Sequence, residues 1–138
     1  MLRKWAMLGV VAAAGWAPAL CDSLAGADRI LCSASTVIMC SDDGDCVMDS
    51  PTELNIPQFI EIDLKGKRLS TTRASGQNRS TPILAMSRDG GQIILQGNEK
   101  GRAFSFVISE TTGMVSVAVA RHGISVSVFG ACTPSTSH

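Results

Sequence analysis

Residues 102–128 read RAFSFVISETTGMVSVAVARHGISVSV, three alternating segments separated by two glycine-containing turns. Within each segment every second residue is large and apolar, and most of the residues between are small or polar. A period of two is typical of β-strands that bury one face. The stretch therefore predicts three consecutive antiparallel strands. Their shared apolar face consists of Phe104, Phe106, Ile108, Val115, Val117, Val119, Ile124, Val126 and Val128.

The same alternation continues toward the N-terminus, where glycine and polar residues again punctuate short apolar segments. Most of the predicted loops have about two to five residues, the length typical of hairpins. Together with the three strands above, this gives about eight strands and no helical apolar stripe. The additional strands are expected at residues 35–39, 58–64, 68–73, 81–87 and 92–96.

We predict an all-β fold, an antiparallel meander of about eight short strands that forms a small barrel or curled sheet and is stapled by disulfides. Closure of a sheet removes its exposed edges. The alternative is a two-layer sandwich, which needs a long crossing connection. Only residues 49–57 have that character, and Pro51 and Pro57 at their ends predict an extended link.

The overall composition indicates a folded chain without an electrostatic preference for nucleic acid. Among 138 residues, twelve basic and twelve acidic groups balance, 45% are apolar and 17% are charged. Such a chain is too apolar to be disordered, and it lacks the basic excess of proteins that bind nucleic acid. Aromatic residues make up only 4%, so recognition by stacking is not expected.

The N-terminus has the order of an export signal. Arg3 and Lys4 precede an uncharged apolar run at residues 7–16, which is too short to span a membrane. We assign residues 1–21 as signal peptide, with cleavage between residues 19 and 27. Cleavage after Cys21 or Ala27 leaves an even number of cysteines, whereas lipid attachment at Cys21 is disfavoured because Leu20 is not small.

The remaining chain is expected to be periplasmic or secreted. It consists of one β-barrel-like domain, residues 28–138, with a cysteine-rich arm at residues 28–50. The oxidising compartment favours disulfides among Cys32, Cys40, Cys46 and Cys132. Cys40 and Cys46 flank a tight polar turn, and a bond from Cys32 to Cys132 would close a long loop. Four cysteines allow three pairings, and all three stay open.

Catalytic and metal-binding patterns are not found in the sequence. His122 lies in a predicted turn and His138 ends the chain, so neither is placed beside a nucleophile. Asp42, Asp43 and Asp45 surround Gly44 without the spacing of a calcium loop. No cofactor is expected, and the protein is not expected to be an enzyme.

The cysteines Cys32, Cys40 and Cys46, the strand at residues 59–64 and the ending at residues 128–134 together resemble small exported bacterial proteins of unknown function. This resemblance implies an exported β-protein and no specific activity. The chain is also loosely similar to the periplasmic C-type lysozyme inhibitors, which are small disulfide-linked β-barrels. The stretch nearest to their serine- and glycine-rich inhibitory loop is residues 75–78.

Our first hypothesis is a non-enzymatic binding or inhibitor module that acts on another envelope or secreted protein through loops on a rigid scaffold. One alternative is a calycin-like carrier that holds a small apolar ligand against the apolar strand face, and another is a structural subunit of an envelope complex. No nucleic acid and no membrane span are expected. The candidate partner-contact residues are Asp42, Asp43, Asp45, Ser75, Gln77, Asn78 and Arg79.

Overall fold

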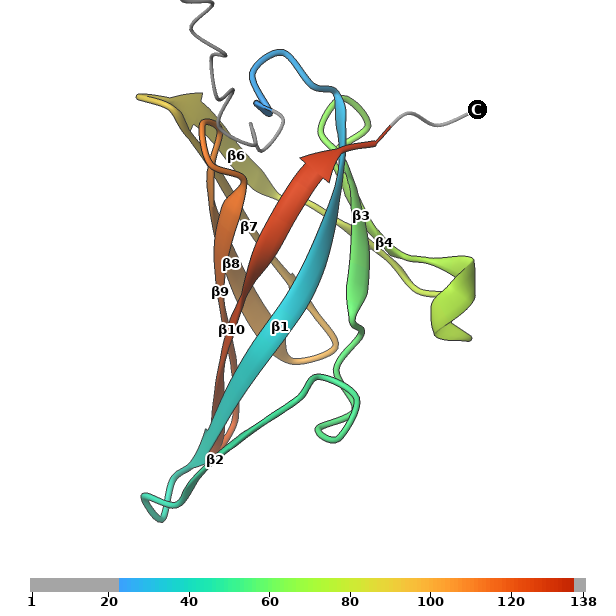
Figure 1. Ribbon diagram of the computed structural model, residues 1–138. Coiled ribbons are helices and arrows are strands. Elements are labelled where there is room, and N and C mark those ends of the chain that lie inside the picture. The colour runs from blue at the N-terminus through green and yellow to red at the C-terminus, as the bar shows by residue number, and fades with distance from the viewer. Residues whose placement is uncertain (1–22, 136–138) are drawn as a thin grey trace, which may run out of the picture.

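A computed structural model describes residues 23–135, which form one antiparallel β-sheet curled into a half-barrel (Figure 1). This confirms the predicted all-β fold, and the described residues contain no α-helix. The signal assigned to residues 1–21 lies outside the described part. The strands are β1 (Arg29–Ser41), β2 (Cys46–Asp49), β3 (Phe59–Asp63), β4 (Arg68–Thr71), β5 (Ser80–Pro82), β6 (Ala85–Asp89), β7 (Gln92–Glu99), β8 (Arg102–Ser109), β9 (Met114–Arg121) and β10 (Ile124–Pro134).

The order of strands across the sheet is β5-β4-β3-β1-β10-β9-β8-β7-β6, and β2 pairs with β1 beside this path. Strands β6 to β10 form the predicted meander, but β1 lies between β3 and β10. The first strand is thus longer than the predicted 35–39 segment and pairs on both sides. Residues 28–50, described above as a cysteine-rich arm, contribute the central strand and its hairpin partner to the sheet.

Both disulfides in the described residues join neighbouring strands. Cys32 on β1 is bonded to Cys132 on β10, and Cys40 on β1 is bonded to Cys46 on β2. In each case the two cysteines are direct cross-strand partners. Of the three pairings that the sequence left open, the structure therefore contains Cys32–Cys132 with Cys40–Cys46. These bonds join β1 to β10, which is distant in the chain, and to β2, which follows it directly.

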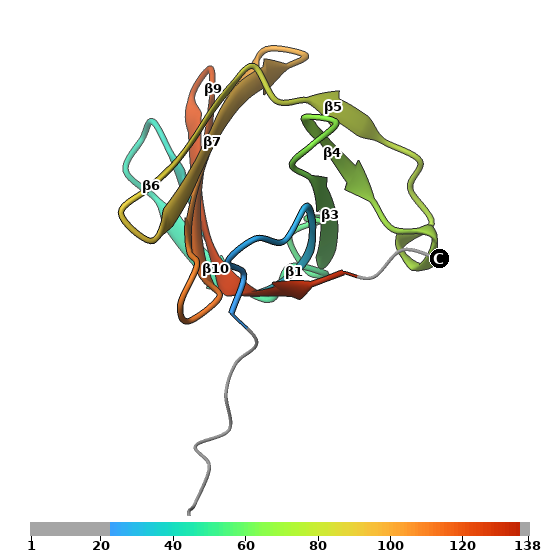
Figure 2. The ribbon, with the colours of Figure 1, turned by 90° about the horizontal axis from the view of Figure 1, so that it is seen from above.

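The predicted strand at residues 81–87 is divided, because the chain there crosses between the two sides of the curled sheet. The Ile83 amide donates to the Lys67 carbonyl, and the next amide, that of Leu84, donates to the Gln96 carbonyl, both at 2.9 Å. These two bonds, from consecutive residues, connect the part of the sheet that contains β4 with the part that contains β7. Figure 2, viewed from above, shows the strands bent around a common centre, with β5 approaching β7.

The connection between β2 and β3 also differs from the prediction. Instead of an extended link, residues 51–55 form turns, because the Ile56 amide donates to the Pro51 carbonyl at 2.8 Å and Asn55 adopts a φ of 55°. The turns bring Leu54 and Ile56 against the inner face of the barrel. This segment therefore partly covers one end of the curled sheet.

Apolar side chains point inward as the alternation predicts, and they form two clusters. The larger one includes the fully buried Ile30, Ile62 and Ile108, whereas the smaller one is centred on Val37, Val126 and Val128. The serines between the valines of β9 and β10 face outward and are exposed. No helix in residues 23–135 is long and apolar enough to cross a membrane.

Candidate functional site

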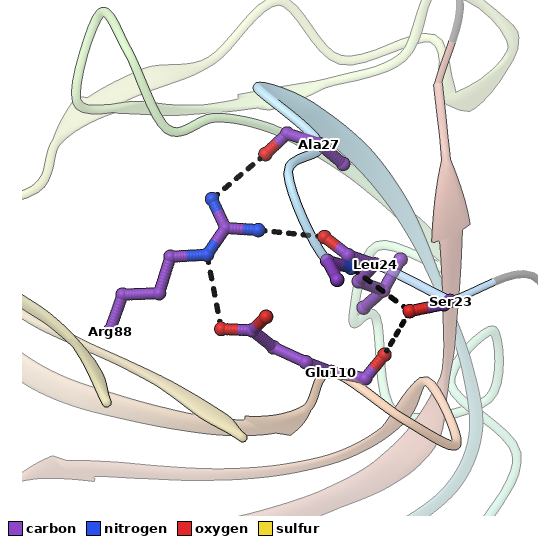
Figure 3. Close-up of polar contacts among 6 residues, drawn as sticks. Ser23, Leu24, Ala27, Arg88 and Glu110 are labelled. Atoms are coloured by element: carbon purple, nitrogen blue, oxygen red, sulfur yellow. Dashed lines mark hydrogen bonds and ion pairs between the residues drawn. The ribbon is translucent and has the colours of Figure 1, made fainter. Parts of the chain in front are cut away.

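One end of the barrel is filled by the N-terminal loop, residues 23–28. Leu24 is fully buried in the larger core cluster, and its amide donates to the Glu110 carbonyl at 2.8 Å. The Arg88 guanidinium holds the loop by donating to the carbonyls of Leu24 at 2.7 Å and Ala27 at 3.0 Å, as well as to the Glu110 carboxylate at 3.0 Å (Figure 3). We call this the plugged end.

The opposite half of the barrel contains a cavity of about 460 Å³. Its walls are mostly apolar and come from the inner faces of several strands together with the turns of residues 54–58. A volume of this size is within the range of small-molecule sites, which is about 300–1,000 Å³. Representative wall residues are Met39, Leu54, Ile56, Phe104, Val117 and Val119.

Strands β1 and β10 both line the cavity, and they pack closely against each other at one glycine. At Gly130 on β10 an added Cβ would collide with the Ser33 backbone carbonyl, and the register of β1 shifts between Ala34 and Thr36 beside it. A bulge of this kind bends a strand and increases its twist. The close approach of β1 and β10 thus depends on glycine.

A second glycine makes room for an aromatic wall. Gly97 on β7 is the cross-strand partner of Phe104, and a Cβ at Gly97 would lie 2.5 Å from the Phe104 ring. The ring instead lies edge-on to Phe106, with centroids 5.9 Å apart and an interplanar angle of 82°. The two phenylalanines therefore line the cavity from β8.

The charged groups that line the cavity all lie at strand ends or in loops opposite the plugged end. They are three arginines and one glutamate, namely Arg79, Arg102, Arg121 and Glu99. Arg79 and Glu99 form an ion pair of 3.2 Å across the gap between β5 and β7. We call this end of the barrel the open end. A polar entrance thus leads to apolar walls.

The environment of Glu99 stabilises its ionised form. The hydroxyl of the buried Thr81 donates a hydrogen bond to the carboxylate and lowers the pKa of Glu99 below its ordinary value, and the Arg79 guanidinium lowers it further. Partial desolvation acts in the opposite direction. Glu99 is therefore held as a carboxylate that faces Arg79.

The acidic turn predicted as a partner contact lies at the tip of the β1–β2 hairpin, which extends beyond the barrel (Figure 1). Asp42, Asp43 and Asp45 are all exposed. The Ser41 hydroxyl donates to the Asp43 carboxylate, as does the Asp45 amide, and these bonds lower the pKa of Asp43. The adjoining β2 exposes Val47 and Met48 at 53% and 70%.

In the other predicted contact loop, residues 75–79, most of the polar groups are hydrogen-bonded within the protein. Ser75 ends a short 3-10 helix, η1 (Arg73–Ser75), and its hydroxyl donates to the Thr72 carbonyl at 2.6 Å. The Gln77 carbonyl accepts a bond from the Thr71 hydroxyl, and Arg79 is paired with Glu99. Asn78 is the most open of the four predicted residues because it alone is exposed. The two predicted loops are thus not brought together into one surface.

Sequence reasoning identified the apolar walls but missed Arg102 and Arg121. Both continue the inward-facing alternation of their strands, in phase with Phe104 and Val119. The alternation of inward and outward residues along each strand could therefore have predicted that both arginines face the cavity. No sequence pattern predicted the positions of Leu24 and Arg88, because each depends on contacts with residues far away in the chain.

The described residues contain no cluster of potential metal ligands. Within residues 23–135 no group of three histidine, cysteine or acidic side chains is positioned to hold a metal ion. His122 is exposed at the turn between β9 and β10. The distinguishing feature of the described residues is the apolar cavity with its charged entrance.

Comparison with known proteins finds no family model and no curated protein that matches this chain.

Proposed function

We propose that this protein is a non-enzymatic carrier that binds an apolar or amphipathic small molecule in the open half of its barrel. The observation that carries the proposal is the cavity of about 460 Å³, whose walls are mostly apolar. Burial of ligand surface against such walls contributes about 25 cal/mol per Å², so a matching ligand would be stabilised without a covalent step.

The separation of the barrel into a filled end and a hollow end supports this function. The plugged end contains most of the fully buried residues and supplies stability, so the open end can stay hollow without loss of the fold. Pockets on a rigid scaffold bind with little reorganisation cost. The Cys32–Cys132 disulfide staples the two strands that form the base of the cavity.

Uptake of the neutral, apolar dye N-phenylnaphthylamine tests the proposal, since its fluorescence rises in an apolar environment. We expect saturable uptake by the purified protein and its loss in Val117→Phe, which fills the cavity from β9. Val107→Phe is the matched control, because Val107 points outward from β8 and is 40% exposed. Absence of uptake by the unaltered protein, together with no co-purified lipid, would reject a carrier function.

A second candidate function, that of a binding or inhibitor module for another envelope or secreted protein, is favoured by the β1–β2 hairpin. This hairpin is stapled by the Cys40–Cys46 disulfide, and it presents Val47 and Met48 next to an acidic turn. Exposed apolar side chains on a rigid element are typical of protein contacts. A cross-linked pull-down from the host envelope should capture one partner stoichiometrically, and Val47→Ser/Met48→Ser should abolish that capture.

A further inference from the structure

The two arginines at the entrance of the cavity have an unusual arrangement. Strands β8 and β9 pair through Ala103 and Ala120, and Arg102 and Arg121 are the next residues in that register. Both lie on the inner face, and both line the cavity. Like charges placed opposite each other on one face of a sheet repel and destabilise the pairing.

Nearby acidic side chains do not neutralise the repulsion between Arg102 and Arg121. Glu99 is the cross-strand partner of Arg102, but its carboxylate is paired with Arg79 and hydrogen-bonded by Thr81. Asp42 lies against Gly123 in the neighbouring turn. Within residues 23–135, neither Arg102 nor Arg121 has a carboxylate oxygen within 4.0 Å.

The charged lining of the cavity consequently has a formal charge of +2, from three arginines and one glutamate. Guanidinium groups bind carboxylate and phosphate oxygens through paired, charge-assisted hydrogen bonds. An anionic group at this position would neutralise both arginines while its hydrocarbon part enters the apolar half of the cavity. A neutral or cationic amphiphile would leave the repulsion in place.

We propose that the ligand is a single-chain anionic amphiphile whose head group is bound between Arg102 and Arg121 and whose apolar chain lies along Phe104, Val117 and Val119. This inference rests on the proposed carrier function and adds the chemical class of the ligand. It also assigns the two arginines as residues that select the head group.

The test compares four ligands with the same hydrocarbon chain, namely dodecanoate, dodecyl phosphate, dodecanol and dodecyltrimethylammonium. Each competes with N-phenylnaphthylamine for the exported, disulfide-bonded protein at low salt. We expect the better of the two anions to bind about tenfold more tightly than dodecanol, and the cation to bind most weakly. The ratio between the two anions identifies the head group.

Arg102→Gln and Arg121→Gln should each lower the affinity for the anions toward that of dodecanol and change the affinity for dodecanol much less. Neither substitution should lower the midpoint of thermal unfolding, because each removes a like-charge pair. Arg73→Gln is the control, since Arg73 is exposed and does not line the cavity.

The outcomes separate this inference from the proposed function. Equal affinity for dodecanol and both anions, with dye displaced by all of them, would overturn the head-group assignment and leave the carrier function in place. Tightest binding of the cation would likewise overturn it. Failure of the unaltered protein to bind the dye or any amphiphile would reject the carrier function itself.

Discussion

Arg88 on β6 donates a hydrogen bond of 2.7 Å to the backbone carbonyl of Leu24, a residue 64 positions earlier in the chain. The same guanidinium also binds Ala27 and Glu110, so a single side chain joins the N-terminal loop to two other parts of the barrel (Figure 3). This relationship keeps Leu24 in the core and makes one end of the barrel solid. The cavity lies in the opposite half.

Replacement of Arg88 should release this loop. Arg88→Met leaves the Ala27 carbonyl and the mostly buried Glu110 carboxylate without their guanidinium donor, and only the Ala27 amide still donates to the Leu24 carbonyl; we expect a loss of about 2–3 kcal/mol in the free energy of unfolding. Urea unfolding measures the change. The exposed Arg73→Met serves as control, and an Arg88→Met variant as stable as that control would contradict the role of the guanidinium.

If the N-terminal segment is cleaved as the sequence predicts, the buried position of Leu24 predicts where the remaining chain begins. Cleavage after Ala27 would remove Leu24 and both carbonyls that Arg88 binds, whereas cleavage after Cys21 keeps them and leaves an even number of cysteines. We therefore expect the intact mass of the protein purified from its host to correspond to a chain that starts at Asp22. A mass corresponding to a start at Asp28 would show that the loop is not part of the working protein.

The two disulfides should differ in their contribution to stability. They join residues separated by 100 and by 6 positions, and the longer loop loses more entropy when the unfolded chain is cross-linked. Replacement of Cys32 and Cys132 by alanine should cost about 4–5 kcal/mol, and replacement of Cys40 and Cys46 about 2 kcal/mol. Urea unfolding of the two double variants checks the order, and a reversed order would contradict the entropic explanation.

Stability should decline in acid partly through Glu99. The hydrogen bond from Thr81 and the charge of Arg79 lower the pKa of Glu99 in the folded state, below its ordinary value of 4.5. Its contribution is therefore fully present above that value and is lost as the pH falls through the lowered pKa. Glu99→Gln should be less stable than the unaltered protein at neutral pH, and the difference should shrink at pH values below the ordinary one. Unfolding curves measured across this range test it, with Glu53→Gln, at an exposed carboxylate, as control.

The close approach of β1 and β10 should make Gly130 intolerant of a side chain. Gly130→Ala places a methyl group against the Ser33 carbonyl, so the backbone must shift at a cost of about 1–3 kcal/mol. Thermal or urea unfolding measures this cost, and Ser127→Ala on the exposed face of β10 is the control. Equal stability of the two variants would show that the strands can separate freely at this point.

The site was predictable to a limited extent. All nine residues of the predicted apolar strand face lie on the inner side of the sheet, but Ile108 belongs to the filled core and does not line the cavity. Arg102 and Arg121 have the same alternation as these residues, so their inward position could have been predicted in the same way. The position of the turns at residues 51–55 could not, because their apolar contacts are with strands distant in the chain.

Alternation along each strand, glycine at the turns and four of the five cysteines were enough to determine an all-β, disulfide-linked fold and to identify the inner face. These features are local, since a strand has a period of two wherever it lies in the sheet. Only the tertiary structure placed β1 between β3 and β10, brought Arg88 to Leu24 and left one half of the barrel hollow. Pairing partners and cavity volume depend on how distant segments fill a shared interior, and no local pattern encodes that balance.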